Sequence, residues 1–337
     1  MNATMLPEKV KHYPVMLNQI LSILSPQHGG TFIDCTFGGG GYSKAILKYP
    51  DTKIIAFDRD SITQKYAEDI NKKFPKRFNF FREKFSNLSK VVNINLKPKA
   101  IIFDLGLSSY QLSDSNRGFS FNSKNFLNME MGLNQNSAYD VVNYFDKNNL
   151  SKIIKVLGDE KEGKIIANKI DQYRKKKPIK TSQELASIIK QAKKRKYNHK
   201  KNPATKTFQA IRIFVNKELT ELASGLIESS KLLSNNGILA VVTFHSLEDK
   251  IVKNFFNIYS NIKKNPSRYL PVKDEKFSLF KFVSKKVLTA DKEEIKENVR
   301  SRSSKLRYAI RNNNTFFNPT EFKNKFADYF QLEGNRI

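Results

Sequence analysis

The residues best suited to chemistry lie at the ends of short apolar segments in the first third of the chain. Asp34 ends one such segment, and four consecutive glycines, Gly38 to Gly41, follow before a helical pattern begins at Tyr42. In α/β proteins, a strand that turns on glycines into a helix makes room for a nucleotide-like ligand, because glycine has no Cβ. The Lys-Ser or Lys-Thr pair of a P-loop is absent, so a nucleoside cofactor without a triphosphate fits better.

Two more aspartates follow apolar segments. Asp58 lies about 17 residues after Gly41, near the spacing of an acid that binds ribose hydroxyls. Asp104 ends the fourth apolar segment. The carboxyl ends of parallel strands form the ligand edge of an open sheet, so these acids and Asp34 should lie together. The alternative for Asp58 is an N-cap of the following helix.

The order of these residues favours a cofactor of the S-adenosylmethionine type over a dinucleotide. Dehydrogenase fingerprints place G-x-G-x-x-G close behind the strand, whereas this turn is longer and begins with an acid. Phe85 would offer an adenine a flat apolar face. It could equally be a core residue, because the chain has 26 phenylalanines.

The surrounding pattern predicts an α/β fold. Apolar segments alternate with helical spacers in the first third, which indicates a parallel sheet covered on both faces. After Asp104 only helical patterns occur until about residue 237. We expect strands at residues 31–35, 53–57, 78–81, 100–103, 237–244, 279–285 and 305–310, and one helix over 207–233. The predicted domains are a sheet domain, 1–107 with 213–337, and an inserted, helical and basic domain, 108–212.

The charge of the chain indicates a polyanionic partner. Its 337 residues include 60 Lys and Arg against 32 Asp and Glu, a formal net charge of +28. Nucleic acid is the first candidate and an anionic membrane the second. The excess of Lys over Arg and the absence of Trp also arise in AT-rich genomes. Basic runs at 174–177 and 193–196 lie in the expected insert, where they would grip phosphates or form a solvated helix face.

Other classes of site and location find no support. The lone cysteine, Cys35, excludes an internal disulfide, and it lies in an apolar strand as a small core residue would. The four histidines show no metal-ligand spacing, so we expect no metal. No apolar run approaches the roughly 20 residues of a membrane span. We therefore expect no membrane partner and a cytoplasmic location.

Seven sequence blocks together resemble the bacterial ribosomal RNA small-subunit methyltransferase H family, also called MraW. They occur in the same order as in the family, and the match runs from about residue 10 to residue 310. The blocks are H-Y-P-V-M-L (12–17), D-C-T-F-G-G-G-G-Y-S (34–43), D-L-G-L-S-S-Y-Q-L (104–112), R-G-F-S-F (117–121), N-P-A-T-K-T-F-Q-A-I-R-I-F-V-N-K-E-L (202–219), F-H-S-L-E-D-K-I-V-K (244–253) and R-S-R-S-S-K-L-R (300–307).

The resemblance implies a Rossmann-like class I methyltransferase sheet with an inserted all-helical domain. It also implies methyl transfer from S-adenosylmethionine to the N4 amino group of a decoding-site cytidine in 16S rRNA. The small ribosomal subunit would be the partner, and a homodimer is left open. The implied cofactor contacts are Gly40, Gly41, Tyr42, Asp58, Phe85, Asp104 and Gln111, to which the strand-end pattern adds Asp34 and Gly38.

Two blocks depart from the family. The family's glycine turn usually ends in G-G-H, whereas here Tyr42 replaces the histidine. The block at residues 126–132 has lost two acids and an arginine and gained one acid relative to P-L-D-M-R-M-D. Altered cofactor or RNA affinity is the expected consequence, but not loss of activity, because the strand-end acids remain.

For the chemistry itself, Asp104 is the first candidate to accept a hydrogen bond from the reacting amine. His245 and Ser246 are the second, although a lone histidine after a strand is more often structural. Glu248 and Asp249 fit helix-start acids.

For RNA, Arg117 with Phe119 and Phe121 would form a stacking set, or the two rings would form an apolar plug over the glycine turn. The other candidate RNA contacts are basic and lie in two clusters. One would bind phosphates, and the second would face RNA or pack on the last strands. The two clusters are Lys193, Lys194, Arg195 and Lys196, and Arg300, Arg302 and Arg307.

Three rival functions remain open at this point. A DNA amino-methyltransferase usually carries an N/D-P-P-Y/F tetrad after strand four, whereas Asp104 is followed by L-G-L. A nicotinamide dehydrogenase would need a tighter glycine fingerprint and a catalytic acid–base pair. A non-enzymatic RNA-binding module would explain the charge but would leave the strand-end acids without a role.

Overall fold

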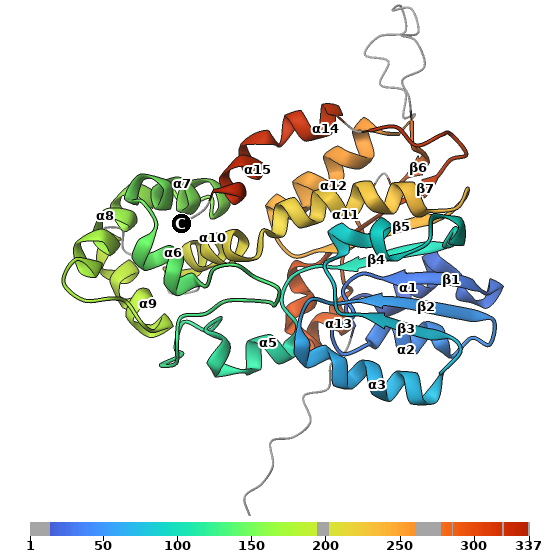
Figure 1. Ribbon diagram of the computed structural model, residues 1–337, viewed down its shortest axis with the longest axis horizontal. Coiled ribbons are helices and arrows are strands. Elements are labelled where there is room, and N and C mark those ends of the chain that lie inside the picture. The colour runs from blue at the N-terminus through green and yellow to red at the C-terminus, as the bar shows by residue number, and fades with distance from the viewer. Residues whose placement is uncertain (1–13, 194–201, 261–277, 285, 319, 336–337) are drawn as a thin grey trace, which may run out of the picture.

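A seven-stranded sheet lies in the right-hand half of the molecule in Figure 1, with helices on both of its faces. The computed structural model describes residues 14–193, 202–260, 278–284, 286–318 and 320–335. The sheet order is β3-β2-β1-β4-β5-β7-β6, and β7 alone runs antiparallel to its neighbours. This confirms the predicted α/β fold with a Rossmann-like sheet. The strands are β1 (Gly30–Asp34), β2 (Thr52–Phe57), β3 (Phe78–Phe81), β4 (Ala100–Asp104), β5 (Ile238–Thr243), β6 (Phe280–Val283) and β7 (Lys305–Arg311).

Both faces of the sheet are apolar. The strands carry consecutive apolar residues, and successive side chains of a strand point to opposite faces. Phe32 and Ile102 pack on one face, whereas Ile33 and Ile101 pack on the other. The first face is covered by α1 (Leu17–Leu24), α2 (Gly41–Leu47) and α3 (Gln64–Lys73). The second is covered by α4 (Leu88–Val91), α11 (Glu218–Leu232) and α12 (Ser246–Ile258).

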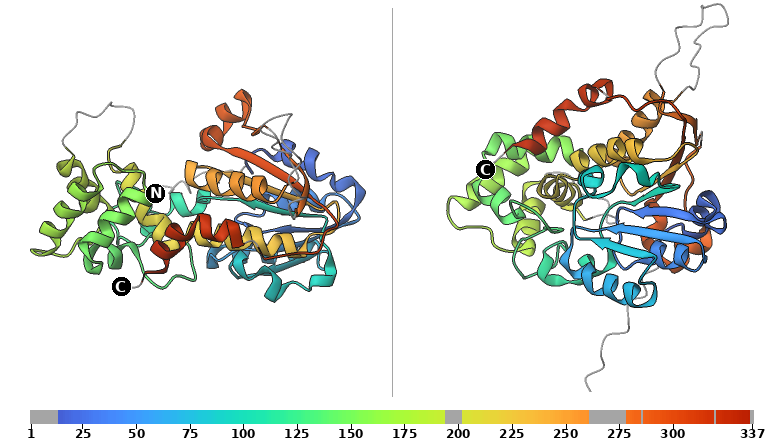
Figure 2. Two further views of the ribbon diagram at one scale, coloured as in Figure 1. Left: turned by 90° about the horizontal axis from the view of Figure 1, so that it is seen from above. Right: turned by 45° about the vertical axis from the view of Figure 1, so that its right-hand side comes forward.

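A helical lobe separates β4 from β5 in the sequence. The described residues between these strands contain helices and a single isolated bridge, Phe126 to Thr181, but no strand. The lobe lies beside the sheet rather than over it (Figure 2). The helices are α5 (Ser109–Ser113), α6 (Ala138–Tyr144), α7 (Lys147–Leu157), α8 (Gly163–Arg174), α9 (Ser182–Ala192) and α10 (Thr205–Asn216).

The lobe and the sheet share one apolar core. Leu150 and Ile189 of the lobe belong to the same buried cluster as Ile101 and Val241 of the sheet. The domain bounds inferred from sequence stay a prediction, and the proposed boundary after residue 212 falls inside α10. The lobe therefore packs as an extension of the sheet's second face.

The prediction of a single helix over residues 207–233 is wrong, because the helix is interrupted at Lys217. This residue has φ 50° and ψ 41°, a left-handed conformation that ends α10 and begins α11. The break brings the first turn of α11 to the carboxyl edge of the sheet. The helices near the C-terminal end were not expected from the sequence, namely α13 (Lys292–Glu297), α14 (Thr320–Lys325) and α15 (Ala327–Gly334). Within the described ranges, no helix combines the length and apolarity needed to cross a bilayer.

Candidate functional site

The glycine turn after β1 is held open by its own side-chain contacts. Asp34 is fully buried, accepts a hydrogen bond from the Ser43 hydroxyl at 2.7 Å, and burial raises its pKa to about 6. Gly40 has φ 75°, and a Cβ there would lie 2.6 Å from Ile70. Asp34 and Gly40 therefore shape the turn from behind, and neither lines the pocket in front of it.

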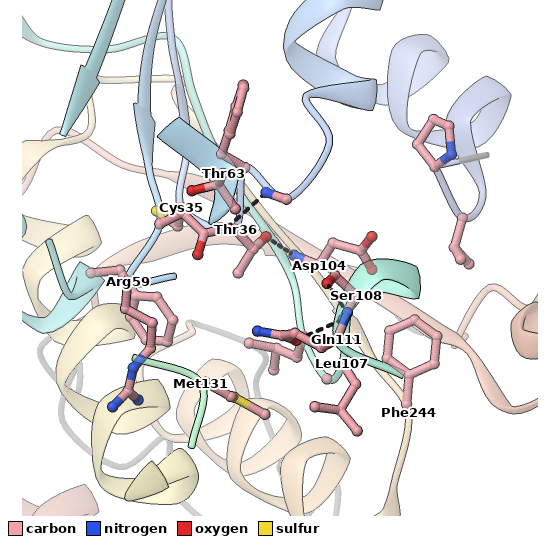
Figure 3. A pocket seen from close by; sticks show the side chains of 18 of the residues that line it. Cys35, Thr36, Arg59, Thr63, Asp104, Leu107, Ser108, Gln111, Met131 and Phe244 are labelled. Carbon is pink, nitrogen blue, oxygen red and sulfur yellow. Dashed lines mark hydrogen bonds between the residues drawn. The ribbon is translucent and has the colours of Figure 1, made fainter. Parts of the chain in front are cut away.

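The pocket lies at the carboxyl ends of β1, β2, β4 and β5, where the sequence placed it (Figure 3). Seven of the nine predicted cofactor residues form its walls, so segments far apart in the sequence converge here. Whether they bind a cofactor stays a prediction. They are Gly38, Gly41, Tyr42, Asp58, Phe85, Asp104 and Gln111.

Asp58 is fixed by the main chain. One carboxylate oxygen accepts the N–H of Gly38 at 2.8 Å, and the other accepts the N–H of Asp60 at 2.9 Å. Burial raises its pKa to about 6, although these hydrogen bonds act in the opposite direction. The predicted alternative, a helix cap, belongs instead to Asp60, whose carboxylate accepts the N–H of Ile62. Asp58 is thus presented to the pocket.

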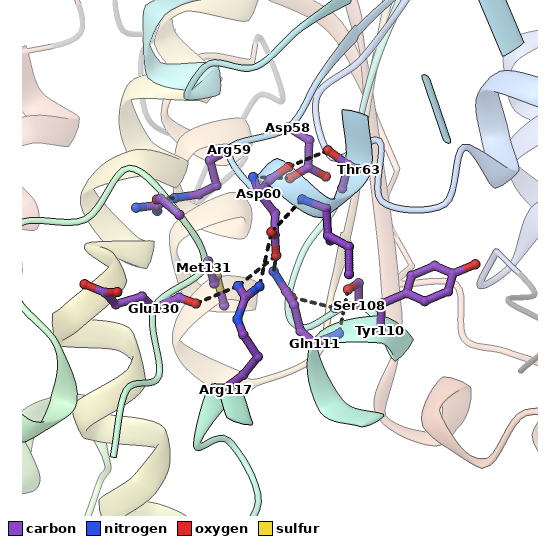
Figure 4. Close-up of polar contacts among 12 residues, drawn as sticks. Asp58, Arg59, Asp60, Thr63, Ser108, Tyr110, Gln111, Arg117, Glu130 and Met131 are labelled. Carbon is purple, nitrogen blue, oxygen red and sulfur yellow. Dashed lines mark hydrogen bonds and ion pairs between the residues drawn. The ribbon is translucent and has the colours of Figure 1, made fainter. Parts of the chain in front are cut away.

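Asp60 connects the pocket to the segment that enters the lobe (Figure 4). Its carboxylate accepts from the Gln111 amide at 2.8 Å and from both terminal nitrogens of Arg117, at 3.2 and 2.8 Å. Arg117 also donates to the carbonyl of Glu130. Gln111 completes a capping box with Ser108, which fixes its side chain in the wall.

Asp104 carries the one strand-end carboxylate oxygen that lacks a partner. Its Oδ1 is buried and makes no hydrogen bond to any described residue. Burial raises the pKa of this carboxyl well above its ordinary value, and the charges of Asp34 and Glu248 raise it further. The Tyr42 side chain acts in the opposite direction, because its hydrogen bonding to the Asp104 carboxyl lowers that pKa, while the Tyr42 hydroxyl also donates to the Val15 carbonyl. A buried acceptor without a partner costs about 1–3 kcal/mol, which points to a ligand group that would pair with it.

His245 and Ser246 are not brought into the pocket wall. His245 caps α12 by accepting the N–H of Glu248 at 3.4 Å, and its Nε2 lies 3.1 Å from the Glu248 carboxylate. This is the structural alternative that the sequence left open. Burial alone would raise the pKa of Glu248, but His245, the Phe244 N–H and Arg212 hold it below its ordinary value.

A group of three possible metal ligands escaped the sequence reasoning. Single ligand atoms of Glu218, His245 and Glu248 lie within 4.8 Å of one another. Arg212, however, already forms hydrogen bonds to both carboxylate oxygens of Glu218, each at 2.8 Å. Because that charge is compensated and Glu248 accepts from the Phe244 N–H at 2.8 Å, the cluster is better explained as an internal ion-pair network.

The predicted aromatic stacking set does not face solvent. Arg117 is committed to Asp60, and Phe119 is buried. Phe121 packs edge-on against Phe208 with ring centroids 4.8 Å apart. The contacts of Arg117 and Phe119 favour the packed alternative, and the base-stacking role stays a prediction.

The predicted basic clusters divide in the structure. Lys193 forms a buried ion pair with Glu160 at 2.5 Å, so its ammonium is not offered to phosphates; Lys194, Arg195 and Lys196 lie outside the described residues. Arg307 pairs with Asp249 at 2.7 Å, and that contact assigns it to the packed alternative. Arg300 lines the pocket and contacts Ser109, whereas Arg302 is exposed.

Further wall residues come from segments that the sequence reasoning did not use. They include Arg59, Lys84, Met131, Glu218 and Glu221. Arg59 directly follows Asp58 at a strand end, a position that could have identified it. Glu218 could not be found, because the expected continuous helix hid the turn that aims it at the pocket.

The sequence was compared with protein-family models and with known proteins. The model of the MraW methylase family matches residues 9–312. The chain is 43% identical over 304 residues to a ribosomal RNA small subunit methyltransferase H from Ehrlichia chaffeensis, covering 89% of this chain and 99% of that protein. A protein of the same name from a Drosophila simulans Wolbachia is 45% identical over 302 residues, covering 88% and 97%.

Solved structures resemble the chain more loosely. An rRNA methylase from Streptococcus thermophilus aligns over 87% of this chain and 95% of its own, with 12% identity and a TM-score of 0.35. The family match, which spans most of the sequence, is far stronger. This chain belongs to the MraW methylase family.

Proposed function

We propose that this protein methylates the N4 amino group of a decoding-site cytidine in 16S rRNA, with S-adenosylmethionine as the methyl donor. Two relatives that each cover nearly nine-tenths of this chain are named as small-subunit rRNA methyltransferases, which supports the substrate class. The observation that carries the choice of an amine acceptor is the unpartnered oxygen of Asp104.

The residues present fit the donor. A Cβ on Gly38 would meet only a carbonyl at 3.9 Å, so open space lies in front of the glycine turn. Asp58 offers two oxygens for the ribose hydroxyls, and Phe85, held edge-on against Phe103 at 5.2 Å, offers a ring for the adenine. When bound, S-adenosylmethionine supplies the methyl group and a positive charge, which favours the ionised form of a neighbouring carboxyl.

Asp104 suits the acceptor side. The lone pair of a cytosine amino group is delocalised into the ring, so the amine is a weak nucleophile. A carboxylate that accepts its N–H makes the lone pair more available and stabilises the positive charge that develops on nitrogen. The rigid attachment of Asp104 supports this role, because its backbone N–H donates to the Thr36 hydroxyl at 2.7 Å.

Methylation of a pyrimidine carbon is the second candidate reaction, and one observation bears on it. Such chemistry uses a thiolate that adds to the ring, and Cys35 does line the pocket. Burial and the charge of Asp34 raise the pKa of this thiol well above its ordinary value, so it stays protonated. The raised pKa of Cys35 therefore favours methylation of the amine over methylation of carbon.

The test is to incubate the protein with labelled donor and small ribosomal subunits that lack the modification, and then to map the labelled base. Label on the N4 atom of a decoding-site cytidine is the expected result. Label on carbon, on another nucleotide, or on DNA oligonucleotides alone would refute the proposed reaction. A Cys35→Ser variant serves as the matched control and should retain activity.

A further inference from the structure

Three aromatic rings line up on the surface of the lobe. The Phe126 and Tyr139 ring centroids lie 5.1 Å apart, and those of Tyr139 and Tyr144 lie 5.9 Å apart. Phe126 is 50% exposed and Tyr144 is 63% exposed. Neighbouring exposed rings form a contiguous apolar patch, and such patches mark interaction sites more often than single exposed side chains do. We call Phe126, Tyr139 and Tyr144 the aromatic row.

The row is held in place by the lobe. Phe126 pairs with Thr181 through a β-bridge, and the next residue donates its N–H to the carbonyl of Lys180 at 2.9 Å. Tyr139 and Tyr144 belong to α6, whose first turn is fixed by a capping box at Ser137. The rings are therefore presented on a rigid support.

Exposed basic side chains surround the row. Arg174 donates to the carbonyls of Val142 and Phe145, so the basic run that it begins starts beside the end of α6. The nearby acids are occupied. Asp140 and Asp146 cap helices, Asp171 pairs with Arg174 and Lys175, and Glu184 pairs with Lys177. The exposed lysines of this surface are Lys124, Lys147, Lys175, Lys176, Lys177 and Lys180.

We infer that the aromatic row and its lysines bind single-stranded RNA during substrate capture. Aromatic rings stack on unpaired bases of any sequence, and lysines bind the phosphates between them. A protein partner fits less well, because lysine is depleted from the cores of protein interfaces. This inference rests on the proposed function for the identity of the RNA.

The position of the row relative to the pocket supports the inference. Met131 lines the pocket, and Phe126 precedes it by five residues. Five extended residues span at most about 18 Å. The buried side chains of Leu127 and Met129 anchor the connecting segment. An RNA strand whose bases stack on the aromatic row is therefore within a few nucleotides of the pocket.

The chain's lack of tryptophan allows a direct test. A Tyr144→Trp variant carries a single indole, whose fluorescence should be quenched when a single-stranded rRNA fragment of the decoding region stacks on it. The double variant Phe126→Ala with Tyr144→Ala should bind the same fragment about 10- to 100-fold more weakly. Because stacking involves no counterion release, the slope of affinity against salt should be unchanged.

The control is Phe282→Ala on β6, which removes a 40% exposed ring that packs against Tyr308 of β7. It should leave RNA affinity unchanged. Melting temperature and donor affinity are measured for every variant, and the single Tyr144→Ser change repeats the test without altering the buried segment beside Phe126.

The outcomes separate the inference from the proposed function. RNA affinity of the double variant within twofold of wild type, or no indole quenching, would overturn the role of the row. Row-dependent binding to assembled subunits but not to naked rRNA would assign a ribosomal protein to the row instead. Loss of RNA affinity in the variants, with wild-type protein that methylates no cytidine N4, would refute the function and leave the row established.

Discussion

Two strand-end carboxylates on opposite sides of the pocket, those of Asp58 and Asp104, differ in how completely their oxygens are paired. On the β1–β2 side, both carboxylate oxygens of Asp58 accept backbone N–H groups. On the β4–β5 side, Asp104 keeps a buried oxygen without a partner among the described residues. Both carboxyls have raised pKa values because of burial. We therefore predict that the β1–β2 side, the binding side, holds the donor, and that the β4–β5 side, the reactive side, takes part in methyl transfer.

The largest effect is expected from a substitution of Asp104, on the β4–β5 side of the pocket. Asp104→Asn removes the negative charge while preserving size, so the rate of a single turnover should fall about 100-fold or more. Donor affinity, measured by calorimetry, should stay within threefold of wild type. A variant that turns over at the wild-type rate would show that both sides only bind.

A smaller effect is expected from Asp58→Ala on the binding side. Loss of an ionised acceptor for two hydroxyls should weaken donor binding by about 10- to 100-fold. Single-turnover rates at saturating donor should change less than affinity does. Asp51→Ala, at an exposed carboxylate, is the control and should bind the donor normally. Unchanged affinity in the Asp58 variant would remove this residue from the binding side.

The pH dependence of donor binding sharpens the same assignment. The pKa of Asp58 is raised to about 6 by burial, so its ionised fraction falls as pH drops through that value. Donor affinity should therefore decrease below about pH 6, by up to tenfold per unit. Calorimetry between pH 5 and 8 measures this, and Asp58→Asn should flatten the curve. A flat wild-type curve would contradict the prediction.

A buried carboxyl outside the pocket can show which pH effects come from burial alone, without a role in donor binding. Glu333 of α15 accepts the N–H groups of Leu219 and Thr220, and burial raises its pKa to about 8. Because the folded-state pKa exceeds the ordinary 4.5, its stabilising contribution is complete below pH 4.5 and is lost as pH rises through 8.

Glu333→Gln mimics the neutral acid but has one acceptor fewer. Its melting temperature should be a few degrees below wild type at pH 5, and this gap should close toward pH 9. Donor affinity should not change at either pH. A gap that is constant with pH would mean that Glu333 does not titrate in this range.

Strand-end logic predicted the pocket because main-chain geometry alone brings Asp58 and Asp104 to one edge of a parallel sheet. The same logic could not tell a wall residue from a support. Asp34 shares the pattern, yet it turns inward to Ser43. Side-chain partners decide that difference, and they come from residues whose proximity only the fold creates.

Charge patterning predicted less. The sequence predicted Arg117 and Lys193 as RNA contacts. In the structure they form ion pairs with Asp60 and Glu160, which are distant from them in the sequence. The aromatic row was missed for the opposite reason. Phe126 and Tyr139 come together because the Tyr139 N–H donates to the carbonyl of Leu127 at 2.7 Å, a contact that no local periodicity signals.

The long excursion between β4 and β5 leaves and rejoins the sheet domain at neighbouring points. Gly106 and Ser108 near its start and Glu218 near its end all belong to the same pocket wall. Because adjacent strands receive both ends, sequence can be gained or lost between them without changing strand order. Insertions or deletions in the lobe would therefore leave the strand-end residues of the pocket in place.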